Sequence, residues 1–395
     1  MQKFHTVVIG GGASGLVSGI SAKRAGNSIV ILERLPVAGK KLLACGGGRC
    51  NFLNEKIDES YFNPSARELI RSAFSRFGKI GILRFFEELG LHYYSEQGRI
   101  FPVTNQASSV LKVLELELKK LDVPVELGFE VADITSSRQG FLVISSTNKR
   151  VICDKIILAA GGRSYPALGS NGSCYKFCRD FGHRVIAPVP SAVPIEISDK
   201  SCHFLQGQKI FVCAKSLING KISSQAAGEL LFTRYGLSGT AILDISQDLS
   251  IALNRQTGDR AEVLVDLVPF IEEPDLKSEL ALRVKKGFEP LNLLCGILPD
   301  KFGLAFGDLL KTKDPDSIAA ELKHKIFKVI RTRGWNEAEF TCGGVDSSEV
   351  NFKSLESKFK KGLYFCGEIL DVQGPRGGYN LAWAFSSGLI AGLTE

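Results

Sequence analysis

The sequence predicts an α/β fold in which both ends of the chain contribute to one domain and an insertion separates them. Three observations support this prediction. A strand, a glycine-rich turn, a helix and a second strand follow one another over residues 7–33. A glycine-rich strand-to-helix segment returns over residues 362–389. Between them, the proline-rich run over residues 188–194 marks a boundary, because proline continues neither a helix nor a central strand.

The N-terminal unit has the pattern of a dinucleotide-binding turn. Gly10 permits a tight turn after the strand, Gly12 lets the backbone approach a pyrophosphate, and Gly15 lets helix and strand pack closely. The start of the helix offers free N–H groups and a partial positive charge to phosphates. Glu33 ends the second strand, where a carboxylate accepts ribose hydroxyls. The residues expected to bind are Gly10, Gly12, Ala13, Ser14, Gly15 and Glu33.

The loop after Glu33 combines glycine with basic side chains. Three consecutive glycines precede Arg49, and Gly39 precedes Lys40 and Lys41. A flexible backbone with cationic side chains is suited to wrapping a phosphate-bearing ligand, although solvated charges on a surface loop would give the same pattern. Because the loop follows the ribose-binding acid, we expect it to contact the ligand. The residues concerned are Arg34, Gly39, Lys40, Lys41, Gly48, Arg49 and Asn51.

The remainder of the first segment mixes helices with strands. Apolar spacing predicts helices over much of residues 64–121, and an alternating pattern predicts a β-meander from 125 to 157. Small residues end this meander, so that a strand end can lie against a flat ligand. Cys174 and Cys178 lie one helical turn apart without a third metal ligand nearby, so we expect core residues and no metal site. The binding residues expected in this segment are Val131, Ala160 and Gly161.

The inserted segment changes from a strand pattern to a helical pattern along its length. Residues 195–268 are expected to form short strands, including one at 241–245, and residues 272–333 are expected to be helical. The stretch over residues 311–333 carries seven Lys and Arg against three Asp and Glu. Such a charge balance fits either a solvated helix face or a face that binds a polyanion.

The C-terminal segment repeats the ligand-binding pattern. An apolar strand ends at Gly367, and a second helix opens at Gly377 and Gly378, where free N–H groups again become available. Two such sites argue for FAD over NAD, because one would hold the ADP half and the other the flavin. A helix start facing the flavin stabilises its anionic reduced ring by about 1 kcal/mol. The residues expected to bind are Gly367, Glu368, Asp371, Gly377, Gly378, Tyr379, Asn380 and Leu381.

Composition and charge narrow the class of protein further. Of the 395 residues, 44% are hydrophobic and 23% are charged, as in ordinary α/β proteins. We find no apolar run of about 18 residues and no signal-peptide pattern, so we expect no membrane association. Ten scattered cysteines fit reduced thiols, which predicts a cytoplasmic location. The formal net charge of +7 suits a polyanionic partner and is equally ordinary for a protein of this length.

These motifs together resemble those of the YhiN/BaiN-like family of bacterial flavoproteins, from end to end of the chain. The resemblance implies a glutathione-reductase-type, Rossmann-like FAD domain with an inserted β-barrel and a small helical subdomain. The domains so implied are 1–190 for the first part of the FAD domain, 191–270 for the barrel, 271–335 for the helical subdomain and 336–395 for the return segment. The motifs lie at residues 10–15, 39–51, 98–102, 161–162, 229–233, 343–345 and 367–381.

The resemblance also implies an activity. Members of the family are similar to NAD(P)H-dependent FAD reductases, and the best substrate prediction is uridine in large-subunit ribosomal RNA, reduced to dihydrouridine. Other members are associated with bile-acid C=C reduction or aminoacetone oxidation, so a small-molecule oxidase or ene-reductase is an alternative. A module that binds FAD without catalysis is a third possibility. The sequence leaves open the choice of NADH or NADPH, the proton donor and the oligomeric state.

Cys45 and Cys50 give a further alternative. Their spacing and their place after the acid-bearing strand match the redox disulfide of pyridine-nucleotide disulfide oxidoreductases, although no second glycine fingerprint for a nicotinamide cofactor follows. Cys45 also stands where the family usually has serine. We therefore take Cys45 and Cys50 as candidate catalytic residues, either as a redox pair or with Cys50 as a lone thiol at the FAD site.

Overall fold

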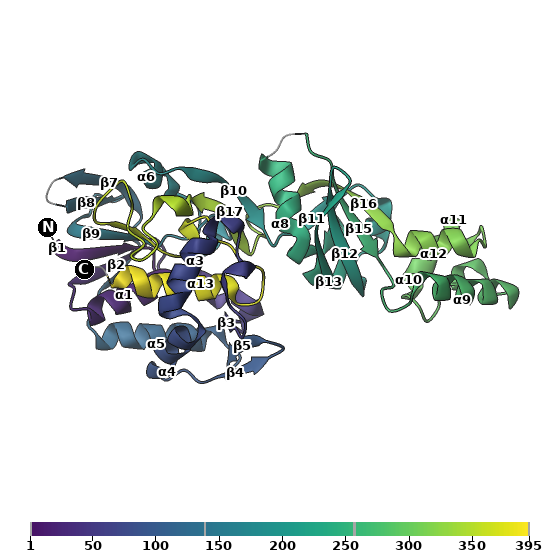
Figure 1. Cartoon of the computed structure of the whole chain (residues 1–395), viewed down its shortest axis with the longest axis horizontal. Helices are drawn as coiled ribbons and strands as arrows, with labels where there is room; N and C mark the ends of the chain where they lie inside the picture. The colour runs from purple at the N-terminus through teal and green to yellow at the C-terminus, as the bar shows by residue number, and fades with distance from the viewer. Residues whose placement is uncertain (1, 138–139, 256–257, 394–395) are drawn as a thin grey trace. The chain divides into compact units, whose positions relative to one another are not determined.

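A computed structural model describes residues 2–137, 140–255 and 258–393. The chain divides into two compact units (Figure 1). Unit 1 comprises Met1–Pro188 and Phe340–Glu395, and unit 2 comprises Val189–Glu339. Both ends of the chain therefore contribute to one unit, and the central segment forms the other.

Unit 1 is built on a seven-stranded sheet whose parallel part carries the N-terminal strands. The strand order is β6 (Val125–Leu127), β2 (Ile29–Glu33), β1 (Gln2–Ile9) and β9 (Arg150–Leu158). β1 pairs in parallel with β2 on one side and with β9 on the other. β2 and the C-terminal ends of β1 and β9 are continuous buried runs, as expected for parallel strands that are covered on both faces.

The far side of β9 is shared by two partners. Its first half pairs antiparallel with β8 (Gly140–Ser145), which in turn pairs with β7 (Val131–Ser137). Its last three residues pair in parallel with β18 (Leu363–Phe365), which comes from the C-terminal segment. The expected β-meander is thus present as β7, β8 and β9, and the return segment extends the parallel sheet.

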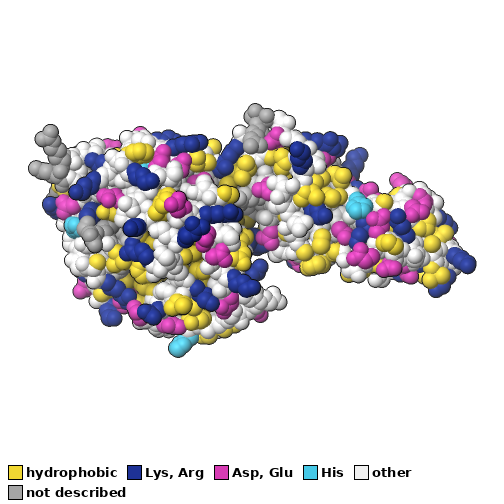
Figure 2. Space-filling model, viewed as in Figure 1, with side chains coloured by type: hydrophobic (Ala, Val, Ile, Leu, Met, Phe, Trp, Pro, Cys, Tyr) yellow, Lys and Arg dark blue, Asp and Glu magenta, His cyan; other side chains and the backbone are white. Residues whose placement is uncertain are grey.

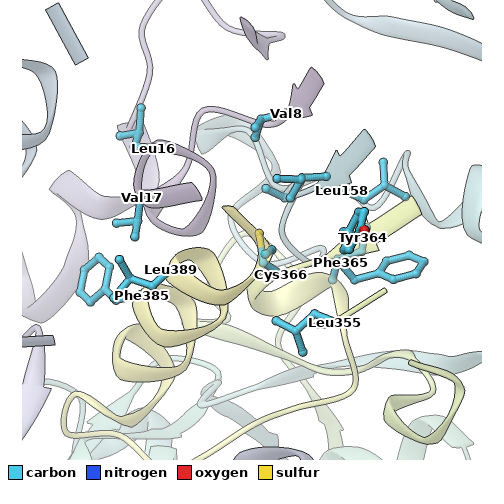
Figure 3. Packing of buried hydrophobic residues seen from close by; sticks show 14 of the residues in the cluster. Val8, Leu16, Val17, Leu158, Leu355, Tyr364, Phe365, Cys366, Phe385 and Leu389 are labelled. Atoms are coloured by element: carbon cyan, nitrogen blue, oxygen red, sulfur yellow. The ribbon is translucent and has the colours of Figure 1, made fainter. Parts of the chain in front are cut away.

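Two helices from opposite ends of the chain pack together against this sheet. α1 (Ala13–Arg24) and α13 (Tyr379–Gly392) lie side by side in Figure 1, and the Ser21 hydroxyl donates to the carbonyl of Leu389 at 2.8 Å. A Cβ at Gly388 would lie 2.6 Å from the Ser14 carbonyl oxygen, so the close approach requires glycine there. Figure 3 shows buried apolar side chains of this core, including Leu16 on α1, Phe385 and Leu389 on α13, and Phe365 on β18.

Further elements surround this core. Cys174 and Cys178 are both buried in it, as expected. The helices are α2 (Lys40–Leu43), α3 (Arg67–Phe77), α4 (Lys79–Glu88), α5 (Ala107–Lys120) and α6 (Tyr175–Asp180). A small antiparallel sheet contains β3 (Leu53–Asn54), β5 (Arg99–Pro102) and β4 (Tyr93–Glu96), and β10 (Val185–Ser191) pairs with β17 (Phe340–Val345). Among the described residues, no helix has both the length and the hydrophobicity needed to cross a bilayer.

Unit 2 contains a closed six-stranded barrel with the helix α8 (Thr240–Arg255) beside it. The strands, in barrel order, are β11 (Ile195–Ile197), β14 (Gly236–Ser238), β13 (Lys221–Thr233), β12 (Lys209–Ile218), β15 (Ala261–Asp266) and β16 (Lys325–Thr332). The helices α9 (Glu273–Lys285), α10 (Asp300–Ala305), α11 (Gly307–Leu310) and α12 (Pro315–Lys323) separate β15 from β16, and α7 (Lys200–Phe204) follows β11.

Two expectations for this unit were wrong. Residues 241–245 belong to helix α8 and not to a strand, because their apolar side chains continue at helical spacing through Ile245 and Leu249. The C-terminal part of the supposed helical stretch, Lys325–Thr332, is strand β16 of the barrel, where buried Phe327 and Val329 alternate with exposed neighbours. Short apolar runs do not by themselves distinguish the two structures. The bounds 271–335 are therefore too wide for a helical subdomain, and a separate subdomain made of α9 to α12 stays a prediction.

A buried histidine makes the stability of unit 1 dependent on pH. The side chain of His183 is fully buried, its Nδ1 lies 3.1 Å from Glu349 Oε2, and its Nε2 lies 2.7 Å from Ser357 Oγ. Burial lowers the pKa of His183, although Glu349 opposes the shift. The folded state therefore binds a proton less readily than the unfolded state, and stability is lost as the pH falls below about 6.5.

We expect His183→Gln to remove this part of the pH dependence. Each pKa unit of lowering corresponds to about 1.4 kcal/mol, so the free energy of unfolding of the wild type should fall more steeply between pH 7.5 and about 5.5 than that of the variant. Chemical denaturation at the two pH values measures both slopes. His203→Gln, at an exposed position, serves as the control. Equal slopes in wild type and His183→Gln would contradict this account.

Candidate functional site

The turn between β1 and α1 has the geometry that the glycine fingerprint predicted. Gly10 has a φ of +111°, and a Cβ there would lie 2.5 Å from the Ala159 carbonyl oxygen. A Cβ at Gly15 would lie 1.9 Å from the Gly10 carbonyl oxygen. At Gly12, by contrast, a Cβ would meet nothing within 4 Å. Close packing within the protein therefore requires glycine at Gly10 and Gly15, whereas Gly12 borders open space.

Both predicted helix starts offer unpaired backbone N–H groups. α1 begins after Gly12 and α13 after Gly378, and at neither start does a described side chain cap the helix or an acid occupy its first turn. A helix N-terminus with these properties carries a partial positive charge and free donors. Both starts can therefore receive anionic or electron-rich groups of a ligand.

Glu33 is held rigidly beside the fingerprint. Its side chain is largely buried, with Oε2 accepting from Gly11 N at 2.7 Å and Oε1 accepting from Leu35 N at 2.8 Å. Each carboxylate oxygen can still accept a further hydrogen bond. The Phe129 N–H donates to the carbonyl of Glu33 at 2.8 Å. This hydrogen bond holds the segment that leads into β7, which begins at Val131, next to Glu33.

The loop after β2 folds back onto the glycine turn. Gly39, with a φ of +70°, donates from its N–H to the Gly11 carbonyl at 2.7 Å and opens α2. Lys40 on this helix is exposed, whereas Lys41 points to a cluster of polar side chains. Arg34 lies 3.9 Å from Glu130, measured between Nη1 and Oε1. The predicted basic loop is therefore near the turn, but its cations differ in their surroundings.

Glu368 joins this loop to the C-terminal segment. Its carboxylate accepts from Lys41 Nζ at 2.6 Å, from Thr341 N at 2.6 Å and from Ser164 Oγ at 3.2 Å. Gly162 N donates to the same carboxylate at 3.3 Å. The side chains of Lys41 and Glu368 are only 26% and 20% exposed, so their ion pair is partly shielded from water. Four segments of unit 1 therefore meet at one carboxylate.

Gly367 forms a second junction, between the two helices α1 and α13 that are predicted to bind the ligand. Its N–H donates to Ser387 Oγ at 2.9 Å, and its carbonyl accepts from Trp383 Nε1 at 3.0 Å. Gly367 has a φ of +73°, and a Cβ there would lie 2.5 Å from Ser14 Oγ. Helix α13 thus fixes the end of β18 directly against the first turn of α1. The structure brings the two predicted glycine sites together.

The start of α13 is fitted just as closely to β3. A Cβ at Gly378 would lie 2.5 Å from the Leu53 carbonyl oxygen, and Asn54 Nδ2 donates to the Gly377 carbonyl at 2.9 Å. Asn380 is used internally, since its Oδ1 accepts from Gly374 N at 2.9 Å. Leu381 follows on the first turn of the helix, partly buried against the core.

The glycine triplet forms an open loop between these elements. Gly46, Gly47 and Gly48 all have positive φ values, of 58°, 65° and 89°. Arg49 turns toward β4 and β5, where it donates to Glu96 at 2.9 Å and lies 4.4 Å from the Phe101 ring centre. Asn51 Nδ2 donates to the Leu53 carbonyl at 2.9 Å. Arg49 and Asn51 therefore shape the loop through contacts within the protein.

The Tyr175 hydroxyl and Gln373 Oε1 are among the buried polar atoms that lack a hydrogen-bond partner in the described part of the chain. They belong to side chains that are 4% and 6% exposed. Burial raises the pKa of Tyr175, with smaller contributions from Glu368 and Asp371, so its hydroxyl stays protonated as a hydrogen-bond donor. Buried polar groups are normally satisfied, and an unsatisfied one costs about 1–3 kcal/mol. A ligand that meets these atoms would remove that cost.

These observations fit an extended dinucleotide such as FAD. Open space at Gly12, two uncapped helix starts and the Glu33 carboxylate are features that the phosphates, the flavin and the ribose of such a molecule require. Sequence reasoning identified these residues but missed Ser164, Thr341, Tyr175 and Gln373. The only available signal was their position beside quoted glycine motifs, because a lone Ser, Thr or Tyr carries no spacing pattern.

Comparison with known proteins connects this geometry to a family. The family model described as the HI0933-like protein Rossmann domain matches residues 4–394. A 3-dehydro-bile acid delta(4,6)-reductase of Clostridium scindens is 34% identical over 98% of this chain and 97% of its own. A ribosomal RNA dihydrouridine synthase of Escherichia coli is 30% identical over 98% of this chain and 96% of its own.

Solved structures show the same fold at low sequence identity. A 3-ketosteroid delta1-dehydrogenase from Sterolibacterium denitrificans superposes with a TM-score of 0.53 at 13% identity, covering 99% of each chain. A 3-ketosteroid-delta4-(5alpha)-dehydrogenase from Rhodococcus jostii gives a TM-score of 0.50 at 14% identity, covering 100% of this chain and 97% of that one.

Proposed function

Because the chain belongs to the HI0933-like Rossmann-domain family, we propose that it is an FAD-dependent oxidoreductase that reduces a carbon–carbon double bond with electrons from NADH or NADPH. The observation that carries this proposal is the junction at Gly367, which sets the first turn of α1 against the strand end held by α13. One extended cofactor can use both helix starts only if they belong to one continuous site.

Different residues would bind different parts of the cofactor. The N–H groups after Gly12 would bind the pyrophosphate, Glu33 the adenosine ribose, and the N–H groups after Gly378 the pyrimidine edge of the flavin. When bound, FAD supplies two-electron transfer. The chain itself provides orientation, because Lys41 and Thr341 fix Glu368 beside the Gly367 junction.

Reduction of a double bond also needs a proton, and a tyrosine pair is placed to supply it. Tyr379, the first residue of α13, is 7% exposed, and its ring centre lies 4.7 Å from that of Tyr61, which is 36% exposed. Burial, followed by the proximity of Tyr61, raises the pKa of Tyr379 to about 12. Tyr379 therefore keeps its proton at neutral pH, and Tyr61 connects it to solvent.

We expect Tyr379→Phe to slow product formation about 100-fold or more, within the range that general-acid catalysis contributes. Flavin reduction by NADH or NADPH should be unaffected, because it needs no such proton donor. Stopped-flow measurement of the two half-reactions separates these effects. Tyr364→Phe, a buried tyrosine on β18, is the control for loss of a hydroxyl alone. Equal slowing of both half-reactions in Tyr379→Phe would contradict the role.

The two relatives' names share one chemistry. A 3-oxo group conjugated to a Δ4 double bond and the C5=C6 bond of uridine are both double bonds conjugated to a carbonyl. We therefore propose an α,β-unsaturated carbonyl as acceptor, with uridine in large-subunit ribosomal RNA as the first substrate. An exposed phenylalanine, Phe359 at 57% exposure, lies among the exposed residues Lys353, Lys358 and Lys361. Aromatic and cationic side chains together suit single-stranded RNA.

A small unsaturated ketone is the second candidate, and ion pairing in unit 2 favours it. Much of the basic stretch over 311–333 is neutralised: Arg331 and Arg333 both pair with Glu196 at 2.8 Å. Lys323 pairs with Asp266 at 2.7 Å, and Lys325 with Glu321 at 2.8 Å. Figure 2 shows acidic and basic side chains mixed over the visible surface. These cations are therefore less available to phosphates than the sequence suggested.

The test proceeds from cofactor to substrate. The purified protein should show flavin absorbance that NADH or NADPH bleaches without oxygen. Mass spectrometry of ribosomal RNA from a deletion strain should show loss of dihydrouridine, and RNA binding should weaken steeply with salt. If dihydrouridine is retained and a 3-oxo-Δ4 steroid reoxidises the reduced flavin independently of salt, the substrate is the small ketone and not RNA. A protein that takes up no FAD would refute the whole proposal.

A further inference from the structure

Cys45 and Cys50 are paired across the glycine loop. The Cys50 N–H donates to the Cys45 carbonyl at 3.1 Å, which closes the backbone of the loop between the two residues. The neighbouring Cys45 side chain, with burial, raises the pKa of the Cys50 thiol. The two residues are therefore neighbours across the loop, and a disulfide requires such proximity. Both cysteines are in the thiol form in this structure.

The two sulfurs differ in access to solvent. Cys45 is partly exposed, whereas Cys50 is fully buried. The pairing is unusual within the described chain. Cys178 donates to the Cys174 carbonyl, but both residues are buried, and Cys295 is exposed with Asn292 Oδ1 at 3.8 Å from its sulfur. Among the described cysteines, Cys45 and Cys50 combine a partly exposed residue with a buried thiol neighbour that can resolve it.

We propose that Cys45 and Cys50 form a peroxide-reactive dithiol site that closes to a disulfide. This inference is independent of the proposed function. It differs from a disulfide that turns over with the substrate, because the oxidant is hydrogen peroxide, the product of the reaction of reduced flavins with oxygen.

The chemistry balances with peroxide as the only oxidant. The Cys45 sulfur attacks one peroxide oxygen, the O–O bond breaks, and a sulfenic acid and one water form. The Cys50 sulfur then attacks the Cys45 sulfur, so that the S–S bond forms and the S–O bond breaks. The second oxygen leaves as water with the proton from Cys50. Two thiols lose two electrons in total, and one hydrogen peroxide becomes two waters.

The disulfide would close the loop that contains the glycine triplet. Gly46 and Gly47 have left-handed backbones, and a Cβ at Gly47 would meet nothing within 4 Å, so the loop borders open space at Gly47. A disulfide between the ends of the loop would restrict its conformations, and a small dithiol reductant would break that bond and return both cysteines to thiols. The site would therefore report oxidative conditions at a segment next to α2 and β3.

The sequence allows a direct test on the purified holoprotein. Trypsin cleaves after Lys41, Arg49 and Lys56, so a disulfide would link the peptides 42–49 and 50–56. The protein is treated with hydrogen peroxide, alkylated under denaturing conditions, digested and analysed by mass spectrometry. We expect the linked peptide pair to become the main form of both peptides, and dithiothreitol to abolish it. Cys295 should not enter a disulfide within the chain.

Two variants sharpen the result. In Cys45→Ser, Cys50 should stay alkylatable after peroxide, whereas Cys295→Ser should give the linked pair as in the wild type. The wild-type measurement alone decides the proposal if Cys45→Ser does not fold. Full alkylation of both cysteines after peroxide, or sulfinic acid at Cys45 with a free Cys50 thiol, would overturn it.

Discussion

Gly12→Ala is expected to give a folded protein that has lost its FAD. A Cβ at Gly12 meets no protein atom within 4 Å, and the residue has an ordinary φ of −83°, so the chain accommodates it. The same Cβ would occupy the place where the backbone approaches the pyrophosphate. We expect FAD affinity to fall at least about 100-fold, roughly 2.7 kcal/mol. The apoprotein's free energy of unfolding should change by less than about 1 kcal/mol.

Two further glycine substitutions make this prediction specific. Gly15→Ala should lose both fold and cofactor, because its Cβ would lie 1.9 Å from the Gly10 carbonyl oxygen. Gly334→Ala, in open space in unit 2, should lose neither. Flavin absorbance per protein and the urea midpoint of the apoprotein measure the two effects separately. A yellow Gly12→Ala protein, or a Gly15→Ala protein as stable as wild type, would contradict the assignment of roles.

Breaking the Lys41–Glu368 pair is expected to have the second largest effect. Lys41→Met leaves a partly buried carboxylate with only hydroxyl and backbone donors, and Glu368→Gln leaves the ammonium group without its counter-charge. We expect each change to lower the free energy of unfolding by about 1–3 kcal/mol. The double variant should recover part of this loss, with a coupling energy of about 1–3 kcal/mol.

A surface ion pair provides the matched comparison. Lys79 Nζ lies 2.9 Å from Glu55 Oε2, with both side chains more than a third exposed. Exposed pairs couple by less than about 1 kcal/mol, because water and salt screen them. Denaturant unfolding of both double-mutant cycles gives the two coupling energies. Equal couplings would mean that Glu368 does not organise the junction of the four segments.

The nucleotide-binding half of the fold could be predicted from sequence because its determinants are local. Gly10, Gly12, Gly15 and Glu33 lie within one βαβ unit, and each has a backbone or charge requirement that few residues meet. The discontinuity of unit 1 also followed, since the second glycine segment needed a sheet to join. β18 pairs with β9 as that reasoning required. The specific contacts of most site residues with FAD stay predictions.

Unit 2 was less predictable because its elements depend on tertiary context. Ile242 and Ile245 fit a short strand as well as a helix, and only packing against the barrel decides between them. The basic stretch was misleading for a similar reason. Arg331 and Arg333 share the partner Glu196, which lies more than a hundred residues earlier in the chain. The sequence around the two arginines therefore could not show that they form ion pairs.

The junction at Gly367 has a consequence for biosynthesis. A ribosome makes the fingerprint more than 350 residues before α13, so the fingerprint helix lacks its neighbour until α13 has emerged. Loading with FAD should therefore follow the synthesis of α13, and a chain stopped shortly before Leu363 would carry the predicted adenosine-binding turn without the helix start that completes the site.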